Sequence, residues 1–199
     1  MQRLQERGLV GPGPTDALLR HADGFREVAE RACGGAPDHA VDLGSGVGIP
    51  GLALALAWPH THWSLLEANQ RKAAVAERLT RSLGLSGRVE VIPERAEVAA
   101  RSADLRGRVD LVVSRLLGPP AVAAEYAAPL LRVGGHLLVS EPPADDPGRW
   151  PPAELEGLGL AEADLRTAVG ARFAVLQQVG AAPDRLPRRP GSAAKRPLW

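Results

Sequence analysis

The stretch at residues 40–54, AVDLGSGVGIPGLAL, constrains the fold of this chain more than any other. A short apolar run ends on an acid at Asp42, glycines follow at Gly44, Gly46 and Gly48, and an alanine- and leucine-rich segment begins directly after them. Glycine permits positive φ and lets the backbone approach a ligand closely, so such a turn can present peptide N–H groups to a negative charge. The stretch therefore predicts a strand, a ligand-binding turn and a helix.

The rest of the chain alternates between patterns typical of strands and of helices. Apolar runs predict strands at 62–66, 88–92, 109–113 and 136–139, and a final pair at 160–167 and 172–179 that would form a hairpin at Val169–Gly170. Helices are predicted from Thr15 to the glycines at 34 and 35, over 69–83, and from Pro119–Pro120 through residue 131. This alternation predicts an α/β fold with a doubly wound, mostly parallel seven-stranded sheet and helices on both faces.

Ligands of such sheets bind at the carboxyl ends of the strands, so the residues that follow each strand are the candidate functional residues. They are Asp42, Glu67, the turn after Ile92, Ser114 with Arg115, and Ser140 with Glu141. The proline-rich segment at 142–152 is predicted to be a loop near the same edge.

Two cofactor classes use a turn of this kind. Gly46, Gly48 and Gly51 spell G-x-G-x-x-G, and Glu67 stands about where a dinucleotide fold places its ribose-binding acid. A dinucleotide fingerprint, however, begins directly at the strand end, whereas the segment LGS separates Gly46 from Asp42. The offset favours the alternative pattern D-x-G-x-G-x-G.

With that pattern the chain resembles the class I methyltransferases that use S-adenosyl-L-methionine. The resemblance implies that the loop backbone cradles the methionine end of the cofactor. It also implies that an acid closing the second strand binds the ribose hydroxyls, and Glu67 has that position.

Composition indicates one ordinary domain. The 199 residues are 45% hydrophobic, and the net charge of +1 points to no particular partner. Cys33 is the single cysteine, which excludes an internal disulfide and a thiolate metal cluster, and we assign no metal. No segment has the length of a membrane span and the N-terminus lacks a signal-peptide core, so we predict a cytoplasmic protein with no membrane partner. We also expect a monomer.

Three segments divide the chain. We predict a short helical extension at 1–38, a methyltransferase domain at 39–182 and a basic tail at 183–199. From residue 181 onward there are five basic residues and one acidic residue. A basic end on an otherwise balanced domain is a candidate phosphate-contacting arm, and the alternative is a solvated tail.

The motifs that serve other methyl acceptors are missing from the sequence. The fourth strand is followed by SRLLGPP and not by an N-P-P-Y type motif, and Cys33 precedes the first strand, far from where a pyrimidine-attacking cysteine would lie. A ring nitrogen such as guanine N7 already offers a lone pair and needs no base. The sequence is therefore compatible with a guanine N7 acceptor.

The wider sequence is similar to one family, the small-subunit ribosomal RNA guanine-N7 methyltransferases, also called the glucose-inhibited division protein B family. The similarity lies in DLGSGVGIPGL, LLEANQRKAAVAERL, RAEV after the third strand, SR closing the fourth, and the terminal PRRPGSAAKRPL. The fifth strand differs, because it closes with SEPP where the family commonly has a lysine-containing segment.

The resemblance implies roles for individual residues and a partner, ribosomal RNA or the small ribosomal subunit. For the cofactor it implies Asp42, Gly44, Ser45, Gly46, Gly48, Glu67, Ala68, Ala96, Glu97, Ser114 and Arg115. Arg115 would face the site of methyl transfer and is the predicted catalytic residue. For RNA the resemblance implies Arg188, Arg189, Lys195 and Arg196.

Three other functions remain open at this stage. One is a small-molecule methyltransferase on the same fold, with residues 142–152 as a lid. Another is a non-catalytic RNA-binding protein that retains the fold and whose RNA affinity falls with salt. A nicotinamide-dependent dehydrogenase is the last.

Overall fold

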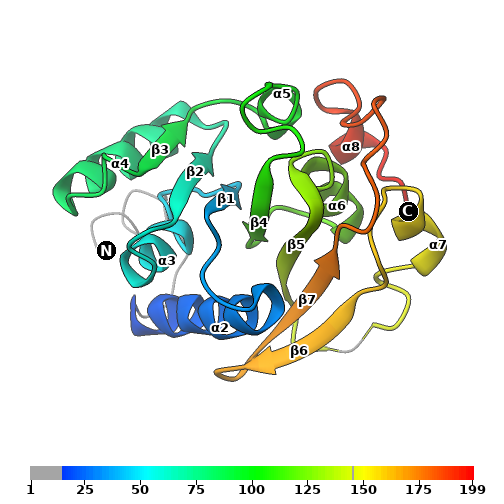
Figure 1. The fold of residues 1–199 in the computed structure, drawn as a ribbon, viewed down its shortest axis with the longest axis horizontal. Coiled ribbons are helices and arrows are strands. Elements are labelled where there is room, and N and C mark those ends of the chain that lie inside the picture. Colours follow the sequence, from blue (N-terminus) through cyan, green and yellow to red (C-terminus); the bar gives the residue numbers. More distant parts are fainter. Residues whose placement is uncertain (1–14, 145) are drawn as a thin grey trace.

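A seven-stranded sheet forms the centre of the molecule, with strand order β3-β2-β1-β4-β5-β7-β6 (Figure 1). The computed structural model describes residues 15–144 and 146–199. Neighbours from β3 to β5 pair in parallel, and β7 runs antiparallel to both β5 and β6. The predicted α/β fold with a mostly parallel seven-stranded sheet is confirmed.

The strands alternate with helices along the chain. The strands are β1 His39–Leu43, β2 His62–Leu66, β3 Val89–Ile92, β4 Val109–Ser114, β5 Leu131–Glu141, β6 Asp164–Ala168 and β7 Ala171–Gln177. The helices are α2 Thr15–Cys33, α3 Gly51–Ala57, α4 Gln70–Ser82, α5 Ala96–Ala99, α6 Pro120–Ala127, α7 Pro152–Glu156 and α8 Ser192–Lys195.

Two apolar clusters cover the two faces of the sheet. Successive side chains of a strand point to opposite faces, so Val112 packs in one cluster while Leu111 and Val113 pack in the other. The cluster around Val112 includes α6, α7 and the C-terminal tail, and the opposite cluster includes α2 and α3 (Figure 1). Burial of both faces explains why the strands are continuous apolar runs.

Local sequence signals account for several boundaries. The Asn69 side chain accepts hydrogen bonds from the backbone N–H groups of Arg71 and Lys72, at 3.0 and 3.2 Å, and so caps α4. The predicted hairpin at the C-terminal edge is confirmed, because Ala168 pairs with Ala171 across Val169 and Gly170.

The boundary between α6 and β5 differs from the prediction. The helix ends at Ala127, and the strand already begins at Leu131. The glycines at 134 and 135 do not separate helix from strand; they form an irregularity inside β5, where Gly134 has φ of 86° and the register with β4 shifts. Glycine in a strand commonly marks such a bulge, so the expected helix through residue 131 and strand from 136 were wrong at these ends.

Three short helices, α5, α7 and α8, were not predicted, because four or five residues carry too little periodicity to be recognised. Helix α7 begins at Pro152, inside the segment expected to be a loop. Residues 1–14 of the predicted N-terminal extension lie outside the described residues. Within the described part of the chain no helix is long and apolar enough to cross a membrane.

Candidate active site

Three glycines after β1 form the predicted turn. Gly44, Gly46 and Gly48 have φ of 73°, 60° and 99°, a region that residues with a Cβ rarely adopt. A Cβ on Gly44 would lie 2.6 Å from Leu117 Cδ1, whereas one on Gly46 would meet nothing within 4 Å. The backbone at Gly46 therefore faces open space in which a ligand can lie directly against it.

Asp42, in β1, fixes the junction between this turn and α3. Its Oδ2 accepts a hydrogen bond of 2.8 Å from the Gly51 N–H, and the side chain is buried. Burial raises the pKa of Asp42 to about 7, although the Gly51 bond and the positive charge of Arg115 act in the opposite direction. Asp42 thus supports the turn from beneath; a direct contact with the cofactor stays a prediction.

Glu67, directly after β2, faces the glycine turn from the neighbouring strand. Its Oε2 accepts from Gly46 N–H at 2.8 Å and its Oε1 from Asn69 N–H at 2.7 Å. These bonds orient the carboxylate, and because each carboxylate oxygen has two lone pairs, both can still accept a ligand hydroxyl. The predicted turn and the predicted acid are thus in direct contact.

A cavity of about 320 Å³, here called the cofactor cavity, opens beside Glu67. The predicted cofactor residues along its lining are Gly44, Glu67, Ala68, Ala96 and Glu97. Leu116 and Leu117 close one side, and Ala194 of α8 also lines it. The structure therefore brings together residues from the ends of β1, β2 and β3, as the carboxyl-edge argument expects.

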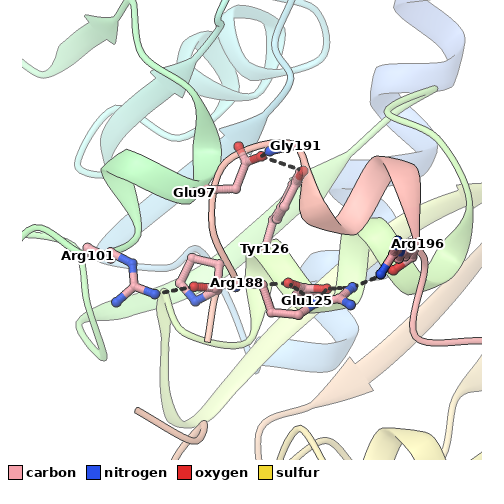
Figure 2. Close-up of polar contacts among 8 residues, drawn as sticks. Glu97, Arg101, Glu125, Tyr126, Arg188, Gly191 and Arg196 are labelled. Carbon is pink, nitrogen blue, oxygen red and sulfur yellow. Dashed lines mark hydrogen bonds and ion pairs between the residues drawn. The ribbon is translucent and has the colours of Figure 1, made fainter. Parts of the chain in front are cut away.

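The side chain of Glu97 is engaged within the protein. Its Oε1 accepts hydrogen bonds of 2.8 Å from the Tyr126 hydroxyl and the Gly191 N–H (Figure 2). The Arg95 guanidinium donates to the same oxygen at 2.8 Å. Burial opposes ionisation of Glu97, but these donors outweigh it, and the pKa of Glu97 lies below its usual value. Contact between the cofactor and Ala96 or Glu97 stays a prediction.

The C-terminal tail packs against α6 rather than extending from the domain (Figures 1 and 2). Arg188 donates to both carboxylate oxygens of Glu125, a residue of α6 whose side chain is fully buried. Leu186 and Ala193 of the tail are buried in the same apolar cluster. The tail is therefore part of the folded unit that surrounds the cofactor cavity.

The four predicted RNA contacts divide into two kinds. Arg188 is ion-paired inside the protein, whereas Arg189, Lys195 and Arg196 are exposed. RNA contact by any of the four stays a prediction.

A second cavity of about 410 Å³, here called the acceptor cavity, lies beside the first, and Leu116 and Leu117 line both. Arg115 lines it from the end of β4 and Glu141 from the end of β5. Burial lowers the pKa of the Arg115 guanidinium, with Asp42 opposing that effect. The predicted catalytic residue thus lines the acceptor cavity, next in sequence to Leu116, which lines both cavities.

Three buried polar atoms belong to residues that line the acceptor cavity. Among the residues that the structure describes, His21 Nε2, Arg115 Nε and Glu141 Oε1 have no hydrogen-bond partner. A buried polar atom without a partner is costly, so these atoms are candidates for ligand contacts. The His21 ring also contacts Phe25 and Phe173.

Two predicted serines are buried next to the cavities. Ser114 Oγ donates to the Leu43 carbonyl at 3.3 Å, which ties β4 to β1. Ser45 Oγ is buried in the glycine turn without a partner among the described residues. Ser114 therefore has a structural bond, while Ser45 retains a free hydroxyl in the turn.

A further cavity of about 490 Å³ is lined by His39, His62 and Arg88, at the amino ends of β1 and β2. It contains none of the predicted site residues.

The sequence predicted a functional strand end at Glu141 but gave this residue no role, and it gave none to Arg149. Arg149 Nε lies 2.5 Å from Glu141 Oε2. The signal for both was an acid at a strand end and a base within the following loop.

The fold and the turn define the class I methyltransferase architecture. A similar solved structure is an RNA methyltransferase from Salinibacter ruber in complex with S-adenosyl-L-homocysteine, 18% identical, with a TM-score of 0.56 over 87% of this chain and 97% of that one. At this level of identity the likeness concerns the fold.

Sequence comparison identifies the family. The model of rRNA small subunit methyltransferase G matches residues 7–142. The curated ribosomal RNA small subunit methyltransferase G of Parasynechococcus marenigrum is 34% identical over 80% of this chain, and that of Rubrobacter xylanophilus is 36% identical over 82%. The chain spans 67% and 66% of the length of these two relatives. It belongs to the rRNA small subunit methyltransferase G family, which confirms the family resemblance found in the sequence.

Proposed function

We propose that this protein is an S-adenosyl-L-methionine-dependent methyltransferase that modifies N7 of a guanine in small-subunit ribosomal RNA. The observation that carries the proposal is the contact between the glycine turn and Glu67 beside an open cavity, in a chain of this family. The relatives are named for methylation of small-subunit ribosomal RNA. Action on ribosomal RNA would also account for the predicted cytoplasmic location.

The residues present fit an adenosyl cofactor. A Cβ would fill the space in front of Gly46, and Glu67 keeps lone pairs for two ribose hydroxyls. When bound, S-adenosyl-L-methionine would supply the methyl group: the guanine N7 lone pair would form the new bond to the methyl carbon, and the electron pair of the broken bond would stay on the sulfur of the departing S-adenosyl-L-homocysteine. Gly44 and Gly46 would hold its methionine end and Glu67 its ribose.

The remaining work of the protein is to position the acceptor and exclude water. Orientation of two reactants can contribute about 7 to 11 kcal/mol to lowering a barrier. Leu116 and Leu117 line both cavities, so the methyl group would be transferred beside apolar side chains. Burial and the charge of Arg115 lower the pKa of His21, which favours the neutral imidazole. Methylation of N7 requires no proton transfer from this histidine.

Calorimetry with S-adenosyl-L-methionine tests the cofactor site. Glu67→Ala should weaken binding by about 1 to 3 kcal/mol, because ribose hydroxyls lose their partner. Glu90→Ala, an exposed glutamate on β3 that lines the cavity at the other edge, is the matched control and should leave affinity unchanged. Equal effects of the two substitutions, or no binding at all, would contradict the proposal.

Methyl transfer tests the substrate. Small-subunit ribosomal RNA and intact small subunits are incubated with labelled S-adenosyl-L-methionine, and the digested RNA is examined by mass spectrometry for 7-methylguanosine. A different methylated nucleoside would refute the N7 assignment while leaving the methyltransferase assignment intact. Cofactor and RNA binding with no transfer would favour a non-catalytic RNA-binding protein.

A further inference from the structure

Glu141 at the end of β5 has an unusual combination of burial and incomplete bonding. Its side chain is 5% exposed, and Oε2 lies 2.5 Å from Arg149 Nε. Its Oε1 is buried with no hydrogen-bond partner among the described residues, and Glu141 lines the acceptor cavity. A buried carboxylate oxygen without a donor is costly unless a ligand provides one.

The arrangement around Arg149 fixes which oxygen is available. The Arg149 carbonyl accepts a hydrogen bond from Trp199 Nε1 at 3.1 Å, and the neighbouring Trp150 is buried. Arg149 is therefore held from its own backbone, and it keeps Oε2 engaged. Oε1 is left as a positioned acceptor.

The order of the strands relates this acceptor to the cofactor cavity. Strands β1, β4 and β5 are consecutive in the sheet, with Leu43 paired to Ser114 and Ser114 paired to Val139. Neighbouring strands lie about 4.8 Å apart, so at the level of these paired residues β1 and β5 are separated by about 10 Å. A planar base above the end of β4 would lie between the two strand ends.

We propose that Glu141 recognises the Watson–Crick edge of the target guanine, an inference that rests on the proposed function. If N7 faces the cofactor on the β1 side, the opposite edge of the purine faces β5. In guanine that edge presents N1–H and the N2 amino group, which are both donors, and an ionised carboxylate is acceptor-only. Adenine has an acceptor at N1, which would oppose Oε1, so the acceptor cavity would select guanine.

Nucleotide titrations followed by NMR test this recognition on the whole chain saturated with S-adenosyl-L-homocysteine. Guanosine monophosphate should bind at least about tenfold more tightly than inosine monophosphate, which lacks the N2 amino group, because a hydrogen bond to a charged group is lost. The affinity for guanosine monophosphate should exceed that for 1-methylguanosine monophosphate by a similar factor. Equal affinities for these three nucleotides would overturn the proposal. So would the absence of detectable guanosine monophosphate binding at concentrations up to about 20 mM.

Glu141→Gln separates recognition from a structural role. With its carbonyl oxygen held by Arg149, the amide would present N–H donors in place of Oε1. The preference for guanosine monophosphate should disappear and adenosine monophosphate, with its N1 acceptor, should gain affinity. If the ion pair between Glu141 and Arg149 has only a structural role, Glu141→Gln should lower the affinity for all nucleotides equally. That result would refute the proposal.

Two controls keep this test independent of the proposed function. Glu154→Gln, an exposed glutamate of α7, should keep the wild-type nucleotide preference. S-adenosyl-L-methionine binding by Glu141→Gln, measured by calorimetry, should equal that of the wild type. Normal 7-methylguanosine formation combined with equal binding of the three nucleotides would leave the proposed function standing and remove the role of Glu141.

Discussion

Arg188 of the C-terminal tail holds the carboxylate of Glu125 with both nitrogens of one edge of its guanidinium, at 2.9 Å from Nε to Oε1 and 2.5 Å from Nη2 to Oε2. The Arg188 backbone N–H donates to the same carboxylate at 3.0 Å. Glu125 is the single charged residue of α6, PAVAAEYA, and every residue of this helix is buried. The tail thus provides the positive charge that allows a glutamate to be buried there.

We expect Arg188→Ala to lower the free energy of unfolding by about 3 to 5 kcal/mol, because it leaves a buried carboxylate without its partner. Arg189→Ala, at the exposed neighbouring position, is the control and should change stability by less than about 0.5 kcal/mol. Urea denaturation of both variants measures the difference. Replacing the pair together, Glu125→Leu with Arg188→Met, should restore most of the loss; similar stabilities of the two single variants would contradict the account.

We expect Gly46→Ala to weaken S-adenosyl-L-methionine binding at least tenfold, since its methyl group would project into the ligand space. Gly170→Ala in the β6–β7 turn is the matched control. The two glycines have φ of 60° and 72°, and in neither case would a Cβ meet an atom within 4 Å. Both variants should therefore lose about 1 to 2 kcal/mol of stability from the left-handed backbone, while calorimetry should show a loss of affinity for Gly46→Ala alone.

The raised pKa of Asp42 predicts a pH-dependent stability. The folded protein has a pKa of about 7 at this residue, against 3.8 for the free side chain. Between these pH values the folded state keeps a proton that the unfolded chain has released, so stability falls as the pH rises to 7 and is constant above it. Asp42→Asn does not titrate, and from pH 5 to pH 8 its stability should rise relative to the wild type by about 3 kcal/mol, at about 1.4 kcal/mol for each pH unit. Chemical denaturation across that range measures the difference, and parallel profiles of the two proteins would show that Asp42 has an ordinary pKa.

The exposed cations of the tail predict a salt effect on RNA binding. Neutralising Arg189, Lys195 and Arg196 together as glutamines should make the plot of log affinity against log salt shallower by about 2 to 3, one for each phosphate contact. Neutralising Arg71, Arg78 and Arg81, three exposed residues on α4, removes the same charge elsewhere and should change the slope much less. Equal changes of slope in the two variants would contradict the prediction that RNA contacts the tail.

Local signals in the sequence were sufficient for most of the fold. Asn69 caps α4 with its own side chain, and Val169–Gly170 reverses the chain between β6 and β7. Such features depend on residues adjacent in sequence. The acid at Glu67 was found for a related reason, since parallel strands bring their carboxyl ends to one edge.

The contacts of the tail could not be predicted in the same way. Glu125 and Arg188 are 63 residues apart, and Glu97 and Gly191 are 94 apart. Such a pairing depends on how the tail crosses α6, which no periodicity reports. The sequence did contain one signal, a single charged residue within the apolar run PAVAAEYA, which requires a partner of opposite charge if the helix is buried.

Leu116 lies at the rim of both cavities with φ of 59° and 85% of its surface exposed. In the free protein this leucine is unfavourable twice, through a backbone conformation that costs about 1 to 2 kcal/mol and through apolar surface left in water. A nucleobase resting on it would dehydrate that surface. The loop after β4 is thus less favourable in the free protein than in a complex. Removal of the exposed leucine surface from water would contribute to the binding free energy of a ligand.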